Sequence, residues 1–216
     1  MNTVVSIIGR SKSGKTTLIE KLIKELNSRG YRVATVKHAP QGADFDHPGK
    51  DSQRHIEAGS DMTALSSPDN LAIMKRVSQD TPLEEIVRLL GEEYDIILTE
   101  GFKQGNAPKI EVHRKTAGEP LEDIKKLMAI VTDEALKTET KQYSFEDIPA
   151  LADLLEKSFI GPQQERISLY VNRMPIPLTS FPRDIIREVI LAMASRLRGV
   201  GEIDSLQIFL KKHRPK

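Results

Sequence analysis

The sequence predicts an α/β protein of the P-loop NTPase type, in which a mostly parallel sheet carries helices on both faces. Apolar, β-branched runs alternate with amphipathic stretches over residues 3–160, and this alternation implies crossover connections between parallel strands. The first apolar run is followed directly by GRSKSGKT at residues 9–16, a glycine-rich phosphate-binding motif that joins a strand to a helix. The ligand of such a sheet is expected at the carboxyl ends of its strands.

The elements of the first half follow from their apolar spacing. Residues 3–8 form a β-branched run that predicts a buried strand. One-sided apolar spacing predicts a helix over residues 15–28, which stops before Gly30. A loop rich in Gly, Pro and Asp follows the second strand. The further elements expected here are strands at 32–36, 63–66 and 71–77, helices at 51–58 and 83–90, and the loop at 40–50.

The second half continues the alternation and then changes character. Three apolar strands are expected at 96–99, 109–113 and 127–132, and a helix at 149–159 has proline in its first turn. The polar stretch GPQQE at 161–165 then marks a domain boundary, so a nucleotide-binding domain over 1–160 precedes a small α/β domain over 165–216. This second unit is predicted as ββαβ, with strands at 167–171, 176–178 and 206–210 and a helix at 181–197.

Composition limits the classes of protein that the chain can represent. With 38% hydrophobic and 29% charged residues and a net charge of +1, it suits a soluble globular protein. No cysteine is present, which excludes disulfides and thiolate metal sites. There is no apolar run of about 18 residues and no signal-peptide pattern, so we expect a cytoplasmic protein without a membrane partner. The basic residues beyond 161 lack interleaved aromatic side chains, so nucleic acid is not expected as a partner.

The phosphate loop is the most specific local signal. Its glycines allow several backbone N–H groups to point at one phosphate, beside the positive end of a helix dipole. Lys15 supplies a cation for the β- and γ-phosphates, and the Thr16 hydroxyl is a candidate ligand of Mg²⁺. The residues predicted to bind the nucleotide are Gly9, Ser11, Ser13, Gly14, Lys15, Thr16 and Thr17.

A magnesium site also calls for a carboxylate at the end of a neighbouring strand. Glu100 follows the apolar strand at 96–99 and is predicted to act with Lys15 in catalysis and with Thr16 in metal binding. Asp46, in the loop after the second strand, is predicted to bind magnesium through water or to orient the attacking water. The alternatives are that Glu100 only caps its turn and that the loop is merely solvated.

Two further assignments stay open in the sequence. The three histidines His38, His47 and His55 suggest zinc, but their spacing fits no compact ligand pattern. Asp133 follows the strand at 127–132 and has two interpretations. It accepts hydrogen bonds from N1–H and the 2-amino group of guanine, donors that adenine lacks. Alternatively, it caps a helix at residues 134–137.

Four segments together resemble one family. They are the phosphate loop, VKHAPQGADFDHPGKDSQRHIEAG at 36–59, DIILTEGFK at 95–103 and KIEVHR at 109–114. They are similar to the molybdopterin-guanine dinucleotide biosynthesis protein B (MobB) family over roughly residues 3–160. The resemblance implies a GTP-binding homodimer with weak GTPase activity that works beside a molybdopterin guanylyltransferase (MobA-like). Lys50, Asp51 and Lys103 match motif positions without a settled role.

Two functions of other classes compete with a slow, magnesium-dependent GTPase. A small-molecule kinase uses the same loop and a base such as Asp46, although residues 115–126 lack the arginines common in kinase lids. A nucleotide-dependent scaffold needs no catalysis. Slow hydrolysis is expected because no glutamine is evident to position water, and Arg10 is the one arginine that could act as a finger.

Overall fold

The computed structural model describes residues 3–210 except 41, 43–50, 162–166 and 173. The chain divides into two compact units, Met1–Gln164 and Glu165–Lys216. Among the described residues, no helix combines the length and the apolar character that crossing a bilayer requires.

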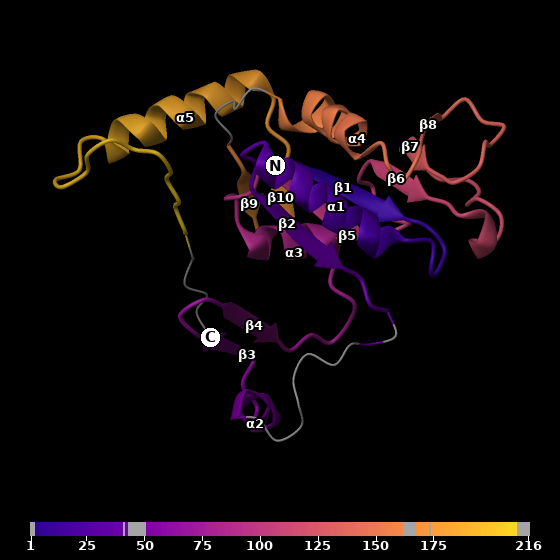
Figure 1. Ribbon diagram of the computed structural model, residues 1–216. Coiled ribbons are helices and arrows are strands. Elements are labelled where there is room, and N and C mark those ends of the chain that lie inside the picture. The colour runs from indigo at the N-terminus through magenta and orange to yellow at the C-terminus, as the bar shows by residue number, and fades with distance from the viewer. Residues whose placement is uncertain (1–2, 41, 43–50, 162–166, 173, 211–216) are drawn as a thin grey trace. The chain divides into compact units, whose positions relative to one another are not determined.

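The first unit is built on a six-stranded sheet in the order β2-β5-β1-β6-β7-β8 (Figure 1). Every neighbouring pair in this sheet runs parallel, which confirms the predicted fold class. The strands are β1 (Val4–Ile8), β2 (Val33–Lys37), β5 (Ile96–Glu100), β6 (Lys109–Val112), β7 (Leu127–Val131) and β8 (Lys141–Tyr143). Because β1 lies in the middle, the loop that follows it is flanked by the ends of β5 and β6.

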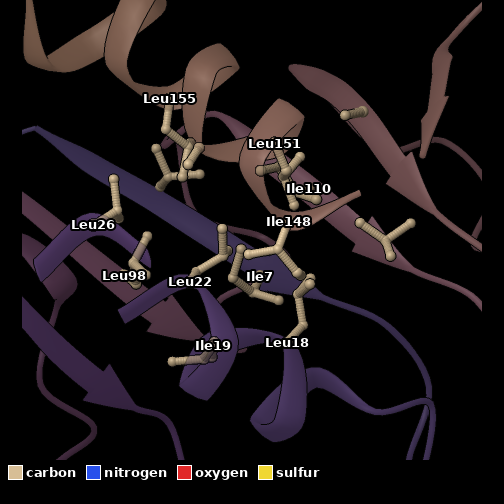
Figure 2. Packing of buried hydrophobic residues seen from close by; sticks show 14 of the residues in the cluster. Ile7, Leu18, Ile19, Leu22, Leu26, Leu98, Ile110, Ile148, Leu151 and Leu155 are labelled. Atoms are coloured by element: carbon tan, nitrogen blue, oxygen red, sulfur yellow. The ribbon is translucent and has the colours of Figure 1, made fainter. Parts of the chain in front are cut away.

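Helices cover both faces of the sheet. Helices α1 (Lys15–Ser28) and α4 (Ile148–Leu155) contribute to the larger hydrophobic core, where their leucines converge on Ile7, Leu98 and Ile110 (Figure 2). The π-helical turn η2 (Glu156–Ile160) continues α4. Helix α3 (Leu83–Leu90) packs against Ile97 and β2 in a second cluster. Since Ile97 alternates with Leu98 along β5, α3 lies on the opposite face.

The long segment between β2 and α3 forms a separate small element. Helix α2 (Asp51–Glu57) precedes the antiparallel hairpin of β3 (Met62–Ser66) and β4 (Leu71–Lys75), as the sequence predicted. An ion pair from Lys75 Nζ to Glu85 Oε1, 2.8 Å, links the hairpin to α3. The hairpin adds no strand to the main sheet, and it exposes large apolar side chains on both strands.

The second unit is simpler than predicted. Strands β9 (Leu169–Val171) and β10 (Met174–Ile176) form an antiparallel pair, and helix α5 (Ser180–Ala194) follows. The strand expected at residues 206–210 is wrong, because that segment has no regular secondary structure. Its apolar side chains Ile208, Phe209 and Leu210 are 65%, 88% and 87% exposed, so the hydrophobic run neither pairs with a strand nor enters a core among the described residues.

Candidate nucleotide-binding site

The loop between β1 and α1 has the tight backbone that a phosphate cradle needs. Gly9 has a φ of +152°, and a Cβ there would lie 2.3 Å from Val112 O on the neighbouring strand. Gly14 has a φ of +100° and precedes the first residue of α1. Both positions therefore require glycine. Ser13 is fully buried, and its hydroxyl has no hydrogen-bond partner among the described atoms, which leaves one unsatisfied donor within the loop.

Lys15 lies folded over this loop. Its ammonium donates to Arg10 O at 2.7 Å and to Gly9 O at 3.3 Å. Desolvation lowers the pKa of Lys15, opposed by the carboxylate of Glu100 and reinforced by Lys103 and Lys37. Lys15 thus experiences two further ammonium groups and one carboxylate, and this surplus of positive charge suits a polyanionic ligand.

Thr16 and Glu100, predicted from separate parts of the sequence, meet at this site. The Thr16 hydroxyl donates to Glu100 Oε2 at 3.0 Å, and Lys37 Nζ lies 4.0 Å from the same oxygen. Glu100 reaches this place because β5 pairs in parallel with β1 and ends beside the phosphate loop. A hydroxyl and a carboxylate are hard oxygen donors that fit Mg²⁺, which is commonly held by one or two carboxylates together with substrate phosphates.

The turn after Glu100 is fixed by a second set of contacts. Gly101 has a φ of +105°, and a Cβ on it would lie 3.1 Å from the His38 side chain. The rings of Phe102 and His38 stack at 4.7 Å between centroids. His38 Nε2 also lies 2.8 Å from Asp80 Oδ2. The ends of β2 and β5 are therefore held together beside the phosphate loop.

The strands on the other side of β1 bring a second group of side chains to the loop. The Arg114 guanidinium lies over the Phe145 ring at 3.9 Å, and Arg114 Nη1 is 3.4 Å from Asp133 Oδ2. A Cβ at Gly14 would lie 3.4 Å from Arg114 Nε and 3.5 Å from Phe145 Cε1, so both side chains border the phosphate loop. Neither Arg114 nor Phe145 was predicted from the sequence. The only available signal for Arg114 was its position in the KIEVHR motif.

Asp133 has a different role from the predicted helix cap. Residues 134–137 are not helical, so the capping alternative is wrong. Its Oδ1 instead accepts a hydrogen bond from the backbone N–H of Lys115 at 3.0 Å. This hydrogen bond is the main cause of the lowered pKa of Asp133, to which Arg114 also contributes. The carboxylate is therefore ionised at neutral pH and anchors the short 3-10 helix η1 (Lys115–Ala117).

The remaining predicted residues divide between described and undescribed parts of the chain. Asp46, His47 and Lys50 lie outside the described residues. His55 is on α2, and no cluster of three His, Asp or Glu side chains suited to a metal occurs in the part of the chain that the structure describes. The Arg10 side chain is engaged by the loop after η1, since its Nε donates to Glu119 O at 2.6 Å. Ser11 and Thr17 are exposed at the rim of the loop.

This arrangement, a glycine-rich loop between the first strand and helix of a parallel sheet with a carboxylate on the next strand, defines a protein of the P-loop NTPase type. A more particular assignment comes from similarity. The family model described as "Molybdopterin guanine dinucleotide synthesis protein B" (MobB) matches residues 4–133. The chain belongs to this family.

Individual relatives agree with that assignment. The molybdopterin-guanine dinucleotide biosynthesis adapter protein of Haemophilus influenzae is 40% identical over 158 residues, which is 71% of this chain and 87% of the relative. The Escherichia coli protein of the same name is 34% identical, over 67% of this chain and 86% of the relative. A putative adapter protein from Methanocaldococcus jannaschii is 25% identical over 95% of this chain and 96% of its own length, so the match reaches into residues 165–216.

Solved structures give the same fold. A crystal structure of molybdopterin-guanine biosynthesis protein B superposes with a TM-score of 0.60 at 30% identity, covering 71% of this chain and 98% of the other. Bacillus subtilis MobB has a TM-score of 0.58 at 28% identity, over 73% of this chain and 98% of its own. Over a little more than 70% of its length, this chain therefore has the fold of known MobB proteins.

Proposed function

We propose that this chain is a cytoplasmic GTP-binding protein with slow, magnesium-dependent GTPase activity, and that it serves as an accessory factor in molybdopterin guanine dinucleotide biosynthesis. The observation that carries the proposal is the meeting of Thr16 and Glu100 at 3.0 Å, beside a lysine that already bonds the loop carbonyls. The names of the relatives supply the pathway, since they are adapter proteins of that biosynthesis.

In the proposed site each residue has a separate task. Lys15 exchanges its hydrogen bonds to Gly9 O and Arg10 O for phosphate oxygens, and the loop amides hold the same group. The Thr16 hydroxyl and the Glu100 carboxylate would hold Mg²⁺, which would neutralise charge on the β- and γ-phosphates. Asp46 is the proposed group for orienting water. Asp133 is the proposed reader of guanine.

Slow turnover is consistent with the position of Arg10. An arginine finger must reach the phosphates whose charge grows in the transition state. Arg10 is instead bonded to Glu119 O, and a Cβ at Gly118 would touch the Arg10 stem at 3.7 Å. The loop over residues 115–126 is likewise fixed by Asp133 and by Glu111, whose Oε1 accepts from Leu121 N at 2.7 Å. Such a fixed loop favours a GTPase over a kinase, whose lid must open and close.

The proposed partners are a molybdopterin guanylyltransferase and a second copy of this chain. The hairpin β3–β4 supports a protein contact, because Met62, Leu71 and Ile73 share one of its faces and are 46%, 66% and 58% exposed. Apolar side chains gathered on a short hairpin are typical of protein interfaces. Sedimentation of the purified protein tests the homodimer, and a monomer at micromolar concentration would contradict it.

Calorimetry with GTP and ATP, each with and without Mg²⁺, tests the nucleotide. We expect saturable GTP binding that is tighter with Mg²⁺ and at least about tenfold tighter than ATP binding, because an Asp that pairs with guanine leaves adenine with unmatched polar groups. Phosphate release without an acceptor, compared with release in the presence of molybdopterin-loaded guanylyltransferase, then separates hydrolase from scaffold. Equal affinity for both triphosphates would remove Asp133 from its proposed role. If no phosphate release is measurable, the protein binds GTP without hydrolysing it, and the scaffold function is supported.

A further inference from the structure

The Arg114 side chain is arranged in the way that a bound purine base would be. One face of its planar guanidinium covers the Phe145 ring at 3.9 Å, and its side chain remains 37% exposed. Stacking of a planar group on an aromatic face is also how proteins hold nucleobases. The stack borders Gly14, so a base held there would belong to a nucleotide whose phosphates lie in the adjoining loop.

The edge of the guanidinium points toward the acid that we assign to guanine. Arg114 Nη1 is 3.4 Å from Asp133 Oδ2, while Asp133 Oδ1 is held by Lys115 N–H. A guanidinium presents N–H donors on two nitrogens attached to one carbon. Guanine presents the same pattern through N1–H and the 2-amino group on its C2 carbon. The two groups therefore compete for the same carboxylate oxygen and the same aromatic face.

We propose that Arg114 occupies the position of the guanine base and that its side chain must be displaced when a guanine nucleotide binds. This inference rests on the nucleotide site proposed above and adds a regulatory residue to it. Asp133 and Phe145 form the base site, and Arg114 is its internal competitor. Adenine lacks the paired donors and cannot replace Arg114 on Asp133, so the competition weakens the binding of guanine nucleotides in particular.

The loop that carries Arg114 keeps the competitor in place. Asp133 accepts from Lys115 N–H, the residue next to Arg114, and Arg10 holds the same loop through Glu119 O. Displacement therefore requires only the Arg114 side chain to rotate, with its backbone held. The contacts to be broken are one exposed ion pair and one cation–π contact, each of which is weak enough for a nucleotide anchored by its phosphates to displace.

The test is the affinity of Arg114→Ala for GTP, ITP and ATP, measured by calorimetry on the full chain. Removing the competitor should tighten GTP binding by about fivefold to tenfold, the worth of the two lost contacts. ITP should gain by a similar factor, because the cost of displacing Arg114 is the same for every base that takes its place, whereas ATP, whose adenine lacks the paired donors, should change by less than about twofold. Arg32→Ala, an exposed arginine outside the site, removes the same charge and should change none of the three affinities.

The sign of the effect decides the proposal. If Arg114→Ala weakens GTP and ATP binding alike, Arg114 helps to bind nucleotide and the proposal is overturned; unchanged GTP affinity overturns it as well. Arg114→Lys, which keeps the charge but loses the planar stack, should tighten GTP binding by a few fold and serves if the alanine variant unfolds. Phe145→Leu should weaken GTP binding, because the base loses its stacking surface. A wild-type protein that binds no triphosphate would instead refute the proposed function, not the role of Arg114 within it.

Discussion

Strands β5 and β6 pair with opposite sides of β1, and each delivers its last residues to the phosphate loop, yet they are built on different principles. Strand β5 reads IILTE, and its first four residues are fully buried. Strand β6 reads KIEV, and its lysine and glutamate are also buried, at 0% and 2% exposure. One strand is held by apolar burial, and the other also buries two charged side chains.

The charged residues of β6 hold the neighbouring loops through hydrogen bonds to their backbone. Lys109 Nζ donates to three backbone carbonyls, those of Gly105, Ala107 and Lys125, at 2.6, 2.9 and 3.2 Å. Glu111 accepts from Leu121 N. Parallel strands usually need a crossover of a dozen or more residues, whereas only residues 101–108 connect β5 to β6. The buried lysine satisfies two carbonyls of this short connection, those of Gly105 and Ala107, and so helps to fix the strand that leads to Arg114.

The phosphate loop between these strands should give the largest effect. Lys15→Ala removes the one ammonium that hydrogen-bonds the loop among the described residues, so we expect GTP affinity to fall at least about 100-fold, about 3 kcal/mol for two charge-assisted hydrogen bonds. Thermal unfolding should shift by only a few degrees, because Lys15 is not part of the hydrophobic core. Calorimetry and a melting curve measure the two quantities.

The matched control is Lys24→Ala, an exposed lysine on the same helix. It removes the same charge from α1 and should leave GTP affinity within about twofold of wild type. If Lys15→Ala binds GTP normally, the phosphate loop is not the nucleotide site, and the residues that β5 and β6 bring to this loop have no role in binding nucleotide.

Lys109→Met tests the charged strand directly. Methionine keeps the apolar stem but leaves three carbonyls without their ammonium donor, so we expect the free energy of unfolding to fall by about 2–4 kcal/mol. Urea denaturation followed by circular dichroism measures the change. Lys126→Met is the control, because its Nζ bonds the single carbonyl of Asn106 at the surface and should cost less than about 1 kcal/mol. Equal costs for the two variants would show that burial of Lys109 is incidental.

Glu100→Gln tests the apolar strand through the residue it delivers. Glutamine can still accept a hydrogen bond from the Thr16 hydroxyl, but it has no negative charge to bind Mg²⁺. We therefore expect the rate of phosphate release to fall about 10- to 100-fold and the Mg²⁺ concentration needed for half-maximal release to rise. GTP affinity should change by less than about threefold. Glu93→Gln, an exposed acid before β5, is the control. Unchanged magnesium dependence would show that Glu100 does not bind the metal and serves only to fix the turn that follows it.

The contrast between the two strands also explains how much of the site was predictable. The meeting of Thr16 and Glu100 could be predicted from the sequence. Thr16 belongs to the phosphate-loop motif, and Glu100 follows an apolar strand whose carboxyl end was expected beside that loop. The contact of Arg114 with Phe145 could not be predicted, since nothing local in a mixed strand or in the short β8 shows which side chains will stack. Their contact depends on the register that places β6, β7 and β8 side by side.

The fold shows the same division. Strands with continuous apolar runs and helix α1 were predicted correctly, because burial on both faces leaves a clear pattern. Strand β8 was missed because it has only three residues, KQY, of which two are polar, so it contains no apolar run. The strand expected at 206–210 was wrong for the opposite reason, since its apolar run has no partner strand among the described residues. Hydropathy alone does not reveal whether a sheet edge is available.

Truncation after residue 164 should have the smallest effect on the nucleotide. The residues of the proposed site all belong to the first compact unit, and that unit contains the whole family match at residues 4–133. We therefore expect GTP affinity and phosphate release to stay within about twofold of the full chain, measured by the same calorimetry and release assays. A loss of about tenfold or more would show that residues 165–216 supply a contact to the site. In that case the residues delivered by β5 and β6 would not be sufficient for nucleotide binding. A role of residues 165–216 in the site would then explain why the match to the Methanocaldococcus jannaschii relative extends over 95% of this chain.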